Sequence, residues 1–96
     1  MLSKMKLKYN LKINEINGQY IAVAIGEDAK KYTDISFVNK VGKYILDILR
    51  TETNRENIIN NVMSHFEGDV DVIRIEVNKF IDKLIELELI DCDSKQ

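Results

Sequence analysis

The sequence contains no proline and no tryptophan, and it has one cysteine and one histidine among its 96 residues. The single cysteine, Cys92, cannot form a disulfide within the chain. A lone cysteine and a lone histidine offer no nucleophile with a partner base. The four glycines are scattered, so no glycine-rich phosphate loop is present. We therefore expect no enzyme, no cofactor and no metal site.

Long apolar runs and an excess of basic charge are also missing. No stretch approaches the roughly 20 apolar residues that span a bilayer, and Met1–Lys8 alternates apolar residues with lysine instead of forming a secretory signal. The net charge of −2 gives no field that favours nucleic acid or an anionic membrane. The composition, 45% hydrophobic and 31% charged, is that of an ordinary soluble globular chain. Without a secretory signal, a spanning segment or a basic excess, we expect a cytoplasmic protein with no nucleic-acid and no membrane partner. We expect a single domain, residues 1–96, with its core in about residues 7–91.

The first half of the chain has the two-residue period of β-strands. Asn17-Gly18 separates two such runs and is typical of a tight hairpin turn, because both residue types tolerate positive φ. A polar segment, Glu27–Thr33, follows and is expected to be a loop. The pattern predicts a three-stranded antiparallel meander with strands at Tyr9–Ile13, Gln19–Ile25 and Asp34–Val38.

The second half has a period near 3.6 residues. Asn39 stands where its side chain can cap a helix, and apolar spacing predicts a helix over Lys40–Arg50. The order of elements indicates an α+β fold that is winged helix-turn-helix-like, with a three-stranded antiparallel sheet followed by three helices. The caps of the second and third helices are expected at Thr53 or Asn54 and at Asp69 or Asp71.

The last helix has two apolar flanks. At 100° per residue, one stripe about 80° wide faces the core and contains Ile73, Val77, Phe80, Leu84 and Leu87. Ile81 and Ile85 fall to one side of that stripe, together with Arg74 and Asn78. They either pack beneath the sheet or form the floor of a groove whose other wall is the third strand.

The third strand is short and follows a polar loop, which favours a place at the sheet edge. An edge strand leaves backbone N–H and C=O groups unpaired and can accept a further strand from another chain. We therefore predict a peptide-binding site at this edge. Its candidate residues are Asp34, Ile35, Ser36, Phe37, Val38, Arg74, Asn78, Ile81, Asp82 and Ile85.

Several segments of the chain resemble the PqqD family. They are the hairpin Leu11–Ile25, the run from Ile35 to Gly42 that leads a strand into an Asn-x-x-Gly helix start, and the long final helix from Asp69 to Ile90. The chain differs from the family at Glu88, where members often have glycine.

The resemblance implies a peptide chaperone of natural-product biosynthesis, a recognition element of ribosomal-peptide modification systems. Its partners would be the leader segment of a precursor peptide and a modifying or processing enzyme, either a radical SAM maturase or a lasso-type leader peptidase. The leader would lie as an added β-strand between the third strand and the third helix.

Two other functions remain open. A winged helix-turn-helix DNA-binding regulator needs a basic recognition helix, whereas residues 71–87 carry three basic and four acidic side chains. A homodimer could instead form if the edge strand paired with its own copy.

Overall fold

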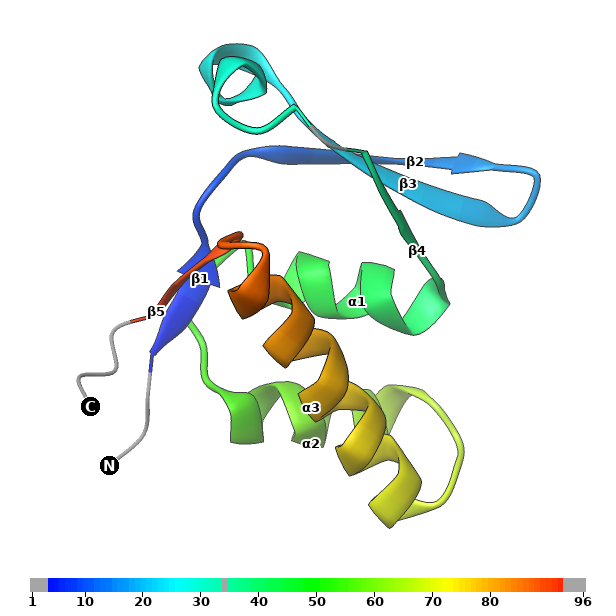
Figure 1. The fold of residues 1–96 in the computed structure, drawn as a ribbon. Helices are drawn as coiled ribbons and strands as arrows, with labels where there is room; N and C mark the ends of the chain where they lie inside the picture. Colours follow the sequence, from blue (N-terminus) through cyan, green and yellow to red (C-terminus); the bar gives the residue numbers. More distant parts are fainter. Residues whose placement is uncertain (1–3, 34, 93–96) are drawn as a thin grey trace.

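The chain forms a small sheet above three helices (Figure 1). The structure, a computed structural model, describes residues 4–33 and 35–92. Strand order in the main sheet is β2-β3-β4 and both pairings are antiparallel, so the predicted α+β meander and its three following helices are confirmed. The elements are β1 (Met5–Leu7), β2 (Leu11–Ile16), β3 (Gln19–Ala24), the 3-10 helix η1 (Gly26–Lys30), β4 (Ser36–Val38), α1 (Lys40–Ile48), α2 (Arg55–His65), α3 (Val70–Glu86) and β5 (Ile90–Cys92).

The turn between β2 and β3 has the geometry that its two residues predict. Asn17 and Gly18 both have positive φ, 52° and 82°, as a two-residue type I′ connection requires. The register then pairs Ile13 with Ala22, and both residues pack into the hydrophobic core. The hairpin prediction is confirmed.

The polar segment after the hairpin is more ordered than a loop. It contains η1, and the Asp28 carboxylate accepts a hydrogen bond of 2.7 Å from the backbone N–H of Asn10. The predicted third strand is confirmed as β4, which begins at Ser36. Asp34, the first residue of the predicted strand, lies outside the described residues.

A second, two-stranded sheet joins the two ends of the described chain. β1 pairs antiparallel with β5, and Met5 also exchanges two backbone hydrogen bonds with Thr53, of 2.8 and 2.9 Å. Met5 is only 2% exposed, so the core begins two residues before the expected boundary at residue 7. This sheet was not predicted, because three-residue strands give too short a pattern to reveal their partners.

Each of the three α-helices begins at a side-chain cap. Asn39 accepts a hydrogen bond from the backbone N–H of Gly42 at 2.7 Å, as predicted for α1. Of the alternatives left open for the other two helices, Asn54 caps α2 and Asp69 caps α3. α1 ends at Ile48, two residues before the predicted end.

The hydrophobic core lies between the sheet and the helices and is continuous through all of them. Its residues come from nearly every element. The core therefore holds the sheet against α1 and holds α3 against both the sheet and α1. Its buried residues are Met5, Leu11, Ala22, Ile45, Leu46, Leu49, Ile58, Ile59, Val62, Val77, Ile81, Leu84, Leu89 and Ile90.

The end of α3 is a Schellman motif. The N–H of Glu88 donates to the carbonyl of Ile85, and the N–H of Leu89 donates to that of Leu84, both at 2.9 Å. Glu88 therefore adopts the left-handed conformation, with φ of 60°. Glycine suits this position best, because it has no side chain to clash in the left-handed conformation.

We expect Glu88→Gly to raise the free energy of unfolding by about 0.5–1 kcal/mol, because it removes the steric cost of a left-handed side chain. Urea unfolding would measure this. The matched control is Lys79→Gly, at an exposed position in the middle of α3, which should lower stability by about 1 kcal/mol. A loss of stability in both variants would contradict the assignment.

Candidate functional site

The outer edge of β4 is available for pairing. β4 pairs with β3 through Ser36, Phe37 and Val38, and it is the last strand in the order β2-β3-β4. No other strand of the described chain lies against its second edge. The prediction that the third strand is a sheet edge is therefore confirmed.

A groove of about 200 Å³ lies between β4 and the C-terminal half of α3. Phe37 is 69% exposed and Leu87 is 38% exposed, so large apolar side chains border the opening without being covered. Lys83 supplies a charged group among the mainly apolar walls. The lining residues are Ser36, Phe37, Val38, Phe80, Lys83, Leu84 and Leu87.

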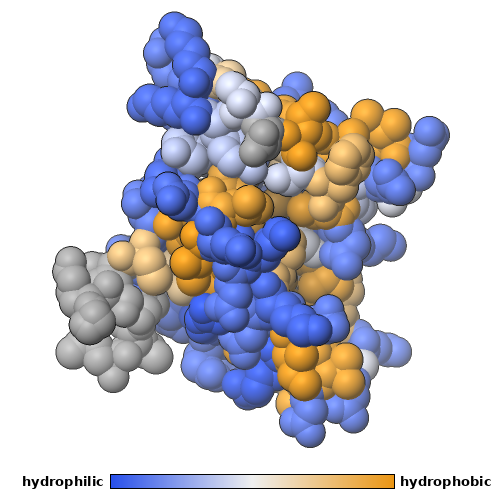
Figure 2. All heavy atoms as spheres, in the orientation of Figure 1, coloured by the Kyte–Doolittle hydropathy of each residue, from blue (hydrophilic) through white to orange (hydrophobic). Residues whose placement is uncertain are grey.

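A second hollow of about 170 Å³ lies between the start of α1 and α3, and Phe80 also lines it. Its lining residues are Asn39, Val41, Gly42, Ile45, Glu76 and Phe80. Residue numbers rise along β4 and α1 while they fall along the facing side of α3. The two hollows therefore follow one line beside α3, with β4 running antiparallel to the helix. Figure 2 shows apolar residues exposed over the sheet and between the sheet and the helices.

Close approach of α1 positions the Phe80 ring. A Cβ atom built on Gly42 would lie 3.0 Å from Cε1 of Phe80 and 3.2 Å from Cβ of Val38. Contacts this short leave no room for a larger residue unless the ring moves. The glycine of the Asn-x-x-Gly segment thus lets α1, β4 and α3 meet at the wall shared by the two hollows.

The structure brings only part of the predicted site together. Ser36, Phe37 and Val38 line the groove as expected. Ile35 precedes them and is 60% exposed, but it does not line the groove. Asp34 lies outside the described residues.

Ile81 does not form the floor of the groove. Its side chain is 0% exposed and belongs to the core, which is the simpler of the two alternatives that the sequence left open. Ile85 is 37% exposed and is not among the groove-lining residues. The helical wheel correctly separated two flanks, but the flank facing β4 carries Phe80, Leu84 and Leu87.

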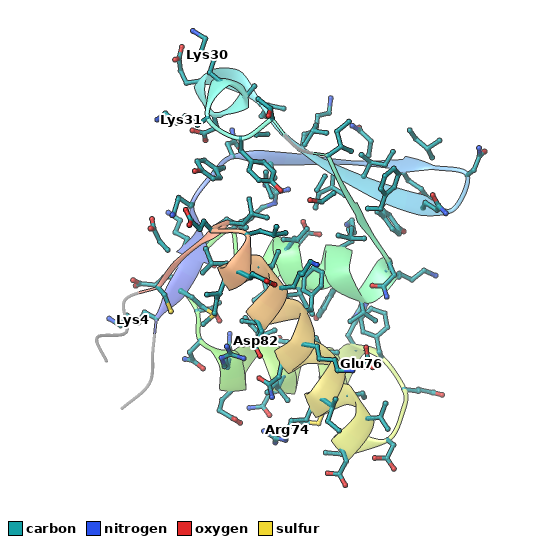
Figure 3. All side chains as sticks on the ribbon, in the orientation of Figure 1. Lys4, Lys30, Lys31, Arg74, Glu76 and Asp82 are labelled. Carbon is teal, nitrogen blue, oxygen red and sulfur yellow. The ribbon has the colours of Figure 1, made fainter. Side chains whose placement is uncertain are left out.

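Arg74, Asn78 and Asp82 also lie on the other flank, which faces α2. Arg74 forms an ion pair of 3.1 Å with Glu56. Arg55 donates to Asn78 at 2.8 Å and to Asp82 at 2.6 Å. In Figure 3, Arg74 and Asp82 lie on one side of α3 and Glu76 on the other. These three residues do not line the groove, and their side chains connect α3 to α2.

Phe80, Lys83, Leu84 and Leu87 are groove residues that the sequence did not identify as such. The sequence places Phe80, Leu84 and Leu87 in the core-facing stripe, and Leu84 does belong to the core while Phe80 packs against it. Helical periodicity marks a side chain as apolar and inward-facing, but it does not tell a filled interior from an open groove. Lys83 carries no sequence signal beyond its charge.

The side chains that could be considered for catalysis do not line the groove. His65 stacks on Tyr44 with ring centroids 4.3 Å apart, and Cys92 is exposed on β5. The pKa of Lys43 is raised because its ammonium group donates to Asp47 at 2.9 Å and is attracted by that carboxylate, but neither residue lines the groove.

Within residues 4–33 and 35–92, no three His, Cys, Asp or Glu side chains gather as a metal site would require. No helix in these ranges is long and apolar enough to cross a bilayer.

The fold is a short antiparallel sheet followed by three helices. Its edge strand β4 leads into α1, and a groove lies beside that strand. This arrangement is an α+β domain of the winged helix-turn-helix type. The chain belongs to the family described as coenzyme PQQ synthesis protein D (PqqD), whose sequence profile matches residues 29–90. The match begins after the β2–β3 hairpin and includes β4 and all three helices. The family expected from the sequence is thereby confirmed.

A solved structure described as "TbiB1 in Complex with the TbiA(beta) Leader Peptide" has the same fold. The TM-score is 0.65, and the alignment covers 90% of this chain and 94% of that chain at 15% sequence identity. A search of curated proteins gives no match.

We expect Gly42→Ala to displace the Phe80 ring and to give none of the roughly 0.5–1 kcal/mol that alanine normally gains over glycine inside a helix. NMR signals of Phe80 and of the Val38 methyl groups should shift, and urea unfolding would give the stability. Ser64→Ala, at an exposed position of α2, is the control for helix propensity. Full stabilisation with unchanged Phe80 signals would show that the packing is looser than described.

Proposed function

We propose that the chain binds the leader segment of a ribosomally synthesised precursor peptide as an added β-strand. The leader would pair with the outer edge of β4 and place side chains in the groove between β4 and α3. The domain would then present the leader to a modifying or processing enzyme.

The observation that carries this proposal is the outer edge of β4, which no other strand of residues 4–33 and 35–92 covers, beside an apolar groove. Strand addition uses both features at once, since the backbone of the edge binds the peptide backbone and the groove accepts alternate side chains. Family membership and the fold shared with a protein solved with a leader peptide support the same conclusion.

The two parts of the site would contribute differently to binding. Each backbone hydrogen bond from Ser36–Val38 contributes about 0.5–1.5 kcal/mol and is indifferent to the peptide's side chains. An apolar anchor between Phe80, Leu84 and Leu87 contributes about 1.5–3 kcal/mol and depends on shape. Ordering a flexible leader costs about 2–5 kcal/mol. The balance favours reversible binding, as a carrier that releases its peptide requires.

The receiving enzyme would be a radical SAM maturase or a lasso-type leader peptidase, as the family resemblance implies. The domain itself would not catalyse the reaction. The β4 edge could also pair with a second copy of the chain, and then leader binding would compete with dimerisation. Light scattering during size exclusion, with and without leader, would detect that competition.

We expect Leu87→Asp to weaken leader binding roughly ten- to hundred-fold, because it removes an apolar wall and places a charge in the groove. Isothermal titration with the leader of a precursor gene neighbouring this one would measure the change. The control is Ile85→Asp, an equally exposed leucine-sized position outside the groove, which should bind within about two-fold of wild type. Circular dichroism would verify that both variants fold. Equal weakening by both would place the peptide elsewhere on α3.

Strand addition also predicts slower hydrogen exchange. When the leader is added, backbone amides of Ser36–Val38 that face the open edge should become protected, because they acquire carbonyl partners. Amides of β1, which pairs with β5 on another side of the fold, are the internal control. Binding without added protection in β4 would rule out an added strand while leaving a side-chain docking mode.

A further inference from the structure

The charged residues of α3 differ in their partners on its two flanks. On the side facing α2, Arg74 pairs with Glu56 and Asp82 pairs with Arg55. On the groove side, Glu76 and Lys83 are both exposed. Neither forms an ion pair with any side chain in residues 4–33 or 35–92. The charges beside the groove are thus not used to hold the described fold together.

These two charges stand at opposite ends of the line of hollows. Lys83 lines the groove beside β4, whereas Glu76 lines the hollow beside the start of α1. They are seven residues apart, which corresponds to about 10.5 Å along a helix. The apolar ring of Phe80 lies between them and borders both hollows.

A peptide strand laid along this line would match that spacing. Alternate side chains of a strand face the same side and are about 6.7 Å apart, so residues four apart are separated by about 13 Å. The flexible side chains of Lys83 and Glu76 can span the small difference. An apolar residue at the centre of the peptide would then contact Phe80. The peptide residues two positions before and two positions after it would contact Glu76 and Lys83.

The direction in which the peptide runs decides which end of it contacts Glu76 and which end contacts Lys83. β4 runs antiparallel to α3, and antiparallel pairing is the slightly more stable arrangement and the one used throughout this sheet. A peptide antiparallel to β4 runs in the same direction as α3. It would therefore meet Glu76 first and Lys83 last.

We propose that the groove selects a peptide segment with the pattern basic-x-apolar-x-acidic, read from the amino end. The acidic residue pairs with Lys83, the apolar residue packs against Phe80, and the basic residue pairs with Glu76. This inference rests on the proposed function and adds the chemistry by which one leader would be distinguished from others.

The pattern also argues against a second copy of the chain as the occupant. The described strands read MKL, LKINEI, QYIAVA, SFV and IDC. None of them has a basic residue followed at two-residue intervals by an apolar and then an acidic one. A strand from a separate peptide fits the groove better.

The test is selection from a phage-displayed library of random short peptides with the full chain as bait. Wild-type protein should enrich the basic-x-apolar-x-acidic pattern. Lys83→Glu should replace the preference for an acidic residue with one for a basic residue, and Glu76→Lys should do the reverse at the other end. Lys79→Glu and Glu86→Lys are matched controls, because both residues are exposed on α3 and line neither hollow. They should leave the enriched pattern unchanged.

Titration of one enriched peptide would give the size of the effect. Each reversal at Lys83 or Glu76 should weaken binding roughly three- to ten-fold at low salt and less at high salt. A peptide with its two charges exchanged should bind the Lys83→Glu, Glu76→Lys double variant better than it binds wild type.

The outcomes separate this inference from the proposed function. Enriched peptides that carry the apolar residue but no charge preference, or a preference unaffected by Lys83→Glu, would overturn the inference and leave peptide binding intact. Enrichment of the reversed order of charges would overturn it equally. If no peptide is enriched, the proposed function fails, and the inference fails with it.

Discussion

The site depends on how α3 is held. Its inner face is fixed by the buried side chains of Val77, Ile81 and Leu84, and its side toward α2 is fixed by the pairs that Arg55 and Glu56 form across the junction. These contacts set the distance between α3 and β4 without filling the space between them. The groove therefore follows from how α3 packs against the core and α2.

The β4 edge and the groove beside it would recognise a peptide in two different ways, through its backbone and through its side chains. An unpaired strand edge binds any extended backbone, and in a monomeric protein it is normally a risk for aggregation. Here the strand is only three residues long and lies beside a groove, so in the proposed binding mode a peptide would have to fit the groove as well as pair with the backbone. This combination would suit the selective but reversible peptide binding that we propose.

The polar side chains of α3 show which flank of the helix is held against α2. Arg74, Asn78 and Asp82 looked from the sequence like ligands for a bound peptide, yet they face α2, where Arg55 and Glu56 bind them. A helical wheel separates the flanks of a helix but assigns no neighbour to either. That assignment depends on packing between elements distant in the chain.

What the sequence determined by itself was local. The Asn17-Gly18 turn, the asparagine cap of α1, the order of strands before helices and the edge position of β4 all follow from interactions within a few residues or between adjacent elements. Tertiary structure alone decided the pairing of β1 with β5 and the choice of Phe80, Leu84 and Leu87 over Ile81 and Ile85 as the helix flank beside β4. The reason is physical: these features arise from contacts between residues far apart in the chain, and apolar character without a known neighbour looks the same in a core as in a groove.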